Sequence, residues 1–109
     1  MAISLERGEI VPVEEPAPST RCDALQTKRV SPLTLQALSA AGARGIAVGE
    51  AEIAAAMVAA FRRLRIVAEP GGAVALAALL SGREEVPEGS VIVVSGGNVD
   101  PGLYSRILS

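Results

Sequence analysis

The stretch VIVVSGGNVD, residues 91–100, predicts a strand, a glycine turn and the start of a helix. Four β-branched apolar residues in a row are typical of a strand that is buried on both faces of a parallel sheet. Gly96 and Gly97 then let the backbone turn sharply and approach another group closely. Asp100 followed by Pro101 has the pattern of a helix N-cap and first helical position. Ligands of open parallel sheets bind beyond the carboxyl ends of the strands, so this turn is a candidate site; a tight connection without a ligand fits the spacing equally well.

Most of the remaining chain has helical patterns. A short helix is expected over residues 3–7, and longer ones over 32–41, 50–65, 70–81 and 102–108. Ser31 before Pro32 predicts an N-cap, and Gly42 and Gly82 are expected to end helices.

Two apolar patterns suggest how these helices pack. The helix over 50–65 carries one apolar face, made of Ile53, Met57, Phe61 or Ala60, and Leu64. Residues 71–81 are almost wholly Gly, Ala, Val and Leu, which predicts a helix buried on all sides. A short apolar run over residues 45–48 predicts a brief strand.

The composition bounds the class of protein. With 109 residues, half of them apolar, the chain has room for one domain at most. A net charge of −2 without a basic block argues against nucleic acid, and no apolar run is long enough to cross a membrane. The single cysteine, Cys22, cannot form an internal disulfide, which favours the reducing cytoplasm. The absence of histidine excludes His-based zinc sites and catalytic triads.

Two motifs in the same order carry a resemblance to a known family. AEPGGAVALAALLSG, residues 68–82, and VSGGNVD, residues 94–100, closely resemble the C-terminal part of the threonine/serine dehydratases. These are pyridoxal-phosphate enzymes of the tryptophan-synthase-β-like fold, called fold type II, and they include serine racemase. The resemblance implies an α/β fold: a partial doubly wound sheet with flanking helices. Residues 21–109 would be the C-terminal part of the catalytic domain, and residues 1–20 an extended, proline-rich connector.

The resemblance also implies a cofactor site. The serine that matches Ser95 hydrogen-bonds the pyridine nitrogen of pyridoxal phosphate in the family, Gly96 and Gly97 would let the ring edge approach the backbone, and Asn98 would brace the turn. The family places the glutamate that matches Glu69 near the ring. From the residues alone, Ser95 is also explained as a turn-capping hydroxyl and Glu69 as a helix N-cap.

Two parts of the family's site have no match in this chain. The lysine that binds the cofactor covalently lies in an N-terminal motif of the family, whereas the single lysine here, Lys28, lies in a loop without that motif. The run of glycines that holds the cofactor phosphate is also absent. The chain therefore looks like the C-terminal portion of a dehydratase that begins at an internal methionine, paired with a missing N-terminal part or a partner chain, and forming a homo-oligomer.

The function implied is part of a lyase that converts a small hydroxy amino acid to a 2-oxo acid and ammonia. Threonine, serine and 3-hydroxyaspartate all remain open as substrates. One alternative is a truncated or complementing chain without catalytic activity. Another is a small amino-acid-binding regulatory domain of ferredoxin-like form, which needs about four strands, whereas two are clear here.

Overall fold

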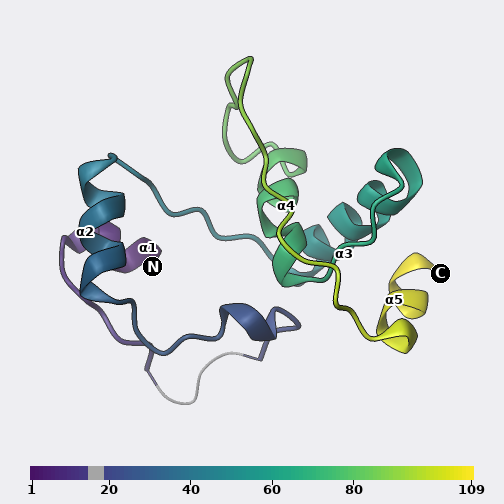
Figure 1. Cartoon of the computed structure of the whole chain (residues 1–109), viewed down its shortest axis with the longest axis horizontal. Coiled ribbons are helices and arrows are strands. Elements are labelled where there is room, and N and C mark those ends of the chain that lie inside the picture. The colour runs from purple at the N-terminus through teal and green to yellow at the C-terminus, as the bar shows by residue number, and fades with distance from the viewer. Residues whose placement is uncertain (15–18) are drawn as a thin grey trace. The chain divides into compact units, whose positions relative to one another are not determined.

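The computed structural model describes residues 1–14 and 19–109, which form two compact units (Figure 1). One unit comprises Met1–Thr20 and Ala24–Ala47, and the other comprises Arg21–Asp23 and Val48–Ser109. Part of the predicted connector over residues 1–20 lies outside the described residues. A short 3₁₀ turn, η1 (Asp23–Leu25), lies where the chain passes from one unit to the other.

The first unit contains the helices α1 (Ala2–Arg7) and α2 (Pro32–Ala40), which pack against each other. The buried Ser4 hydroxyl accepts a hydrogen bond from the Val11 N–H at 3.1 Å, and this contact folds the chain back after α1. Ser31 caps α2 by accepting a hydrogen bond from the Thr34 N–H, as the sequence predicts.

The second unit is organised by three helices. The helix α3 (Glu50–Ala59) continues as one π-helical turn, η2 (Ala60–Leu64), and packs against both α4 (Val74–Leu80) and α5 (Pro101–Leu108). A 3₁₀ turn, η3 (Gly71–Ala73), leads into α4. The core is made of small and medium side chains: Cys22, Ile53, Ala56, Met57, Ala60, Ala68, Ala73, Leu76 and Ala77. These small residues let the helices approach closely.

The local signals at the ends of the helices are confirmed. Asp100 caps α5 by accepting a hydrogen bond from the Leu103 N–H at 2.7 Å. Gly42 and Gly82 both adopt positive φ, of 64° and 66°, directly after the last turns of α2 and α4. These geometries depend on neighbouring residues only, so a sequence pattern predicts them well.

The expected strands do not form in the part of the chain that the structure describes. Residues 45–48 and 91–94 are extended but belong to no ladder, so a doubly wound sheet is not confirmed by the structure. The run 91–94 was expected to be buried on both faces. Instead Val91 and Val93 are 86% and 64% exposed, while Ile92 and Val94 pack against the core. A strand needs a hydrogen-bonded neighbour, and no described segment pairs with this run.

Two helices also differ from expectation. The predicted helix over 50–65 changes to π geometry at Ala60. On the apolar face predicted for this helix, Ile53, Met57 and Ala60 are buried, whereas Phe61 and Leu64 are exposed. The helix expected to be buried on all sides starts with a 3₁₀ turn and leaves Ala75 and Leu80 exposed. A helix apolar all round becomes buried only where other elements surround it.

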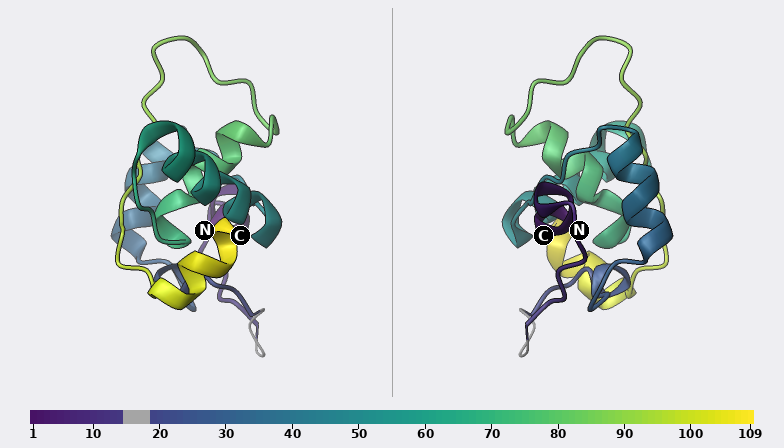
Figure 2. Two further views of the ribbon diagram at one scale, coloured as in Figure 1. Left: turned by 90° about the vertical axis from the view of Figure 1, so that its right-hand side faces the viewer. Right: turned by 90° about the vertical axis from the view of Figure 1, so that its left-hand side faces the viewer.

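The loop over residues 83–90 projects away from the helices of its own unit (Figures 1 and 2). Arg83, at its start, holds it to α3 through an ion pair with Glu52 at 2.8 Å. Among the residues described, no helix has the length and apolar character needed to cross a membrane.

Candidate cofactor site

The predicted site residues lie where two loops of the second unit meet. One segment, residues 67–72, comprises the end of the loop after the π turn and the first two residues of η3. The other is the segment over residues 95–98, which we call the serine turn. The Glu69 N–H donates a hydrogen bond to the Gly96 carbonyl at 2.9 Å. The Asn98 N–H donates to the Glu69 carboxylate at 3.1 Å. The structure thus brings Glu69, Gly96 and Asn98 together across 29 residues of sequence.

Glycines make this close approach possible. A Cβ atom on Gly72 would lie 2.6 Å from the Gly96 carbonyl oxygen, and one on Gly97 would lie 2.8 Å from the Val67 carbonyl oxygen. A Cβ atom on Gly96 would collide with the Glu69 carboxylate. The chain itself therefore fills the space next to these glycines. Sequence reasoning did not assign Gly72 and Val67 to the site, and the pair Gly71-Gly72 after Pro70 is the signal that points to them.

Ser95 lies at the end of the extended segment, directly before this junction. Its side chain is exposed, and its hydroxyl makes no hydrogen bond with any residue that the structure describes. The hydroxyl therefore caps no turn there. Glu69 likewise caps no helix: its carboxylate accepts from Asn98, and neither η3 nor α4 has a side-chain cap.

The residues present fit one side of pyridoxal phosphate. The Ser95 hydroxyl has no partner among the described residues and directly precedes a backbone that is hydrogen-bonded at Gly96 and Asn98. Such a hydroxyl is a neutral group that can bond a ring nitrogen. The covalent attachment point does not fit: Lys28 is the single lysine, and the residues around it do not match the lysine motif of the family. No cluster of metal-binding side chains occurs in residues 1–14 and 19–109.

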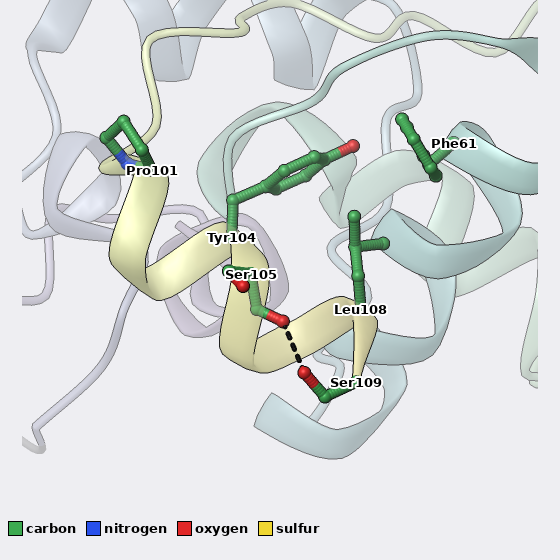
Figure 3. Close-up of a pocket in the computed structure, with 6 residues that line it drawn as sticks. All are labelled: Phe61, Pro101, Tyr104, Ser105, Leu108 and Ser109. Atoms are coloured by element: carbon green, nitrogen blue, oxygen red, sulfur yellow. Dashed lines mark hydrogen bonds between the residues drawn. The ribbon is translucent and has the colours of Figure 1, made fainter.

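A separate pocket of about 460 Å³ lies beside α5 and contains none of the predicted site residues (Figure 3). It is lined by Phe61, Pro101, Tyr104, Ser105, Leu108 and Ser109. The rings of Phe61 and Tyr104 meet edge to face, with their centres 5.8 Å apart. The Tyr104 hydroxyl is buried without a hydrogen-bond partner among the described residues, and burial raises the pKa of Tyr104. This pocket was not predicted from the sequence.

Comparisons with known proteins identify the family. Residues 1–96 match the family described as pyridoxal-phosphate dependent enzyme. The chain is 34% identical to the L-threonine ammonia-lyase of Thermotoga maritima over 109 residues, which is all of this chain and 27% of that protein. It is 39% identical to the L-threonine ammonia-lyase of Geobacter sulfurreducens over 106 residues, covering 96% of this chain and 26% of that protein.

Solved structures give the same result. The crystal structure of the T.th. threonine deaminase superposes with a TM-score of 0.80 at 36% identity, covering 91% of this chain and 36% of that one. Maize serine racemase superposes with a TM-score of 0.79 at 32% identity, covering 96% of this chain and 33% of that one.

The chain therefore belongs to the family of pyridoxal-phosphate-dependent enzymes, and it is homologous to threonine ammonia-lyases and serine racemase. It corresponds to their C-terminal part and spans between a quarter and about a third of the length of the relatives cited.

Proposed function

We propose that this chain forms the C-terminal part of a pyridoxal-phosphate-dependent lyase that converts threonine or serine to a 2-oxo acid and ammonia. The observation that supports this most directly is the Ser95 hydroxyl, which has no hydrogen-bond partner among the described residues and lies beside the bonds that join Glu69 to Gly96 and Asn98. The relatives cited above include threonine ammonia-lyases. In the complete enzyme the extended segment 91–94 would be part of the doubly wound sheet.

The chain's own contribution would be the pyridine-nitrogen side of the cofactor site. When bound, pyridoxal phosphate withdraws electrons from the α-carbon of the substrate, which allows the β-hydroxyl to leave. The Ser95 hydroxyl would donate a hydrogen bond to the ring nitrogen. Because a hydroxyl is not acidic enough to protonate that nitrogen, it favours elimination over transamination, whereas a carboxylate at this position would strengthen electron withdrawal. Gly96, Gly97 and Asn98 would hold the backbone that carries the hydroxyl.

A second portion would supply the lysine and the phosphate site. The exposed side chains of Val91 and Val93, and the unpaired backbone between them, support this proposal because they match a strand that lacks its neighbour among the described residues. A chain of this size buries too little apolar surface to cover such a strand alone. We propose that the partner is the N-terminal part of the same fold, in a homo-oligomer.

The first test separates an enzyme part from a complete enzyme. The purified chain, mixed with pyridoxal phosphate and threonine, should form no 2-oxo acid, and turnover should appear when a lysine-bearing N-terminal portion is joined to it. Turnover by the chain alone that is lost in Lys28→Ala would make Lys28 the attachment point and overturn this division. No turnover with any N-terminal portion would favour the alternative of a non-catalytic chain.

The second test addresses Ser95 in the joined protein. Ser95→Ala should lower turnover by an amount equivalent to about 1–3 kcal/mol, because a buried hydrogen bond is lost. Ser95→Asp should raise the ratio of transamination product to 2-oxo acid. Ser105→Ala, which changes an exposed serine on α5, serves as the control and should alter neither. If both Ser95 variants behave like this control, Ser95 does not contact the ring.

A further inference from the structure

Among the described side chains of the candidate site, that of Glu69 has a hydrogen-bond partner within the site. Its carboxylate accepts a hydrogen bond from the Asn98 N–H at 3.1 Å, and its own N–H donates to the Gly96 carbonyl at 2.9 Å. One residue thus bonds the serine turn at two points, one before and one after Gly97. Hydrogen bonds from a backbone N–H to a carboxylate are stronger than those between neutral groups.

The packing around Gly96 also supports the contact between Glu69 and the serine turn. The Glu69 carboxylate lies where a Cβ atom on Gly96 would be, so the side chain extends across the inner face of the serine turn. Gly72 also approaches the Gly96 backbone so closely that a Cβ atom on Gly72 would lie 2.7 Å from the Gly96 nitrogen. Gly96 is therefore in close contact with both the Glu69 side chain and the η3 backbone.

We infer that Glu69 is a positioning residue: it sets the conformation of the serine turn, and thereby the direction of the Ser95 hydroxyl, and it carries no proton in the reaction. The inference deepens the proposed function and rests on it where the cofactor is concerned. A group that must give and take a proton needs a free oxygen aimed at the substrate. Here one carboxylate oxygen, Oε2, accepts from the Asn98 N–H, and the other, Oε1, lies against Gly96, so both oxygens face the serine turn.

The first experiment measures amide hydrogen exchange in the full 109-residue chain. Glu69→Ala should make the Asn98 amide exchange about ten- to a hundredfold faster. Glu69→Gln, which keeps a neutral acceptor oxygen, should accelerate it clearly less. Asp100→Ala is the matched control, because it removes a carboxylate that accepts the Leu103 N–H and should release only that amide. Unchanged exchange at Asn98 in Glu69→Ala would overturn the inference.

The second experiment tests the collision between a Cβ atom on Gly96 and the Glu69 carboxylate, and it measures thermal stability instead of amide exchange. Gly96→Ala should lower the melting temperature of the chain, and should lower it less when Glu69→Ala is already present, because the methyl group then meets no side chain. Gly72→Ala should be equally harmful in both backgrounds, since its collision is with backbone atoms of Gly96. Equal losses for Gly96→Ala in both backgrounds would contradict the contact.

The third experiment concerns the cofactor. In the joined protein, Glu69→Ala should shift the absorption of bound pyridoxal phosphate as Ser95→Ala does, the double variant should add nothing, and Glu69→Gln should restore the original spectrum and pH profile. A proton-carrying role predicts that Glu69→Gln is as damaging as Glu69→Ala and removes one limb of the pH profile. If no cofactor binds, the proposed function fails, whereas the first two experiments still decide the role of Glu69.

Discussion

The junction between residues 67–72 and the serine turn can be compared with the extended segment 91–94 that runs into it. In the junction, Glu69 bonds the turn through both its backbone N–H and its carboxylate. Gly72, Gly96 and Gly97 have no side chain at points where the two segments come close together. The segment 91–94 has the same apolar, β-branched character as a central strand, yet its backbone pairs with nothing that the structure describes.

This difference shows which parts of the fold the chain completes from its own residues. The junction needs only segments that the chain contains. Ala68 belongs to the core, and Val94 and Val99, which flank the serine turn, pack against it. In the segment 91–94, Ile92 and Val94 pack against that core, whereas Val91 and Val93 are exposed. The described residues therefore cover only one of the two faces of this segment. The four predictions that follow probe this division.

The largest effect is expected in the core under the junction. Met57 is fully buried between α3 and its neighbours, and Met57→Ala should reduce the free energy of unfolding by about 2–5 kcal/mol, because it removes apolar contacts and leaves a cavity. Urea unfolding followed by circular dichroism measures this loss. Val58→Ala, at a half-buried position on the same helix, should cost clearly less; an equal cost would mean that the core is not packed around Met57.

The junction itself should be sensitive to one added methyl group. Gly72→Ala brings a Cβ atom to 2.6 Å from the Gly96 carbonyl oxygen, so the two loops must separate, and we expect a loss of about 1–3 kcal/mol in the same urea assay. The gain in helix propensity from alanine works against this loss and is smaller. A neutral or stabilising Gly72→Ala would show that the loops are not in contact.

The exposed side of the segment 91–94 should respond only when its partner is present. Val93→Ser should change the stability of the chain alone by no more than about 0.5 kcal/mol, because the side chain is exposed. In the protein joined to an N-terminal portion, the same change should cost about 1.5–3 kcal/mol, since the valine would then be buried. Val94→Ser is the control and should be costly in both. An equal, small effect of Val93→Ser in both proteins would show that no strand covers this side.

The smallest effect concerns acid stability at the start of α3. The Gly49 N–H, at 2.6 Å, and then Arg83 lower the pKa of Glu52 below its ordinary value of 4.5. Because the folded pKa is the lower one, the contribution of Glu52 to stability is present above the ordinary value and is lost as the pH falls through the folded pKa.

The stability difference between the chain and Glu52→Gln should therefore narrow as the pH falls below the ordinary value of 4.5. Thermal melts at a series of pH values measure this difference. Arg83→Ala should retain most of the narrowing, because the Gly49 N–H is the larger cause. A difference that stays constant with pH would mean that Glu52 is not held by these groups in solution.

The sequence alone determined the features that depend on near neighbours. Ser31-Pro32 and Asp100-Pro101 start helices as predicted, and Gly42 and Gly82 end them, because a capping bond joins atoms only two or three residues apart. The motifs around Glu69 and Ser95 also indicated the family, which the comparisons confirm. In each case the information lies within one short stretch.

Only the tertiary structure decided how these stretches meet. The bond between Glu69 and Asn98 spans 29 residues, and no sequence pattern distinguishes it from a helix cap at Glu69. The strand predicted over 91–94 remains unpaired for the same physical reason, since a ladder needs hydrogen-bonding groups on a second segment, which the described residues do not supply. Local sequence thus sets the conformation that a segment prefers, and its partner in space sets whether that preference becomes a helix face, a loop junction or a sheet.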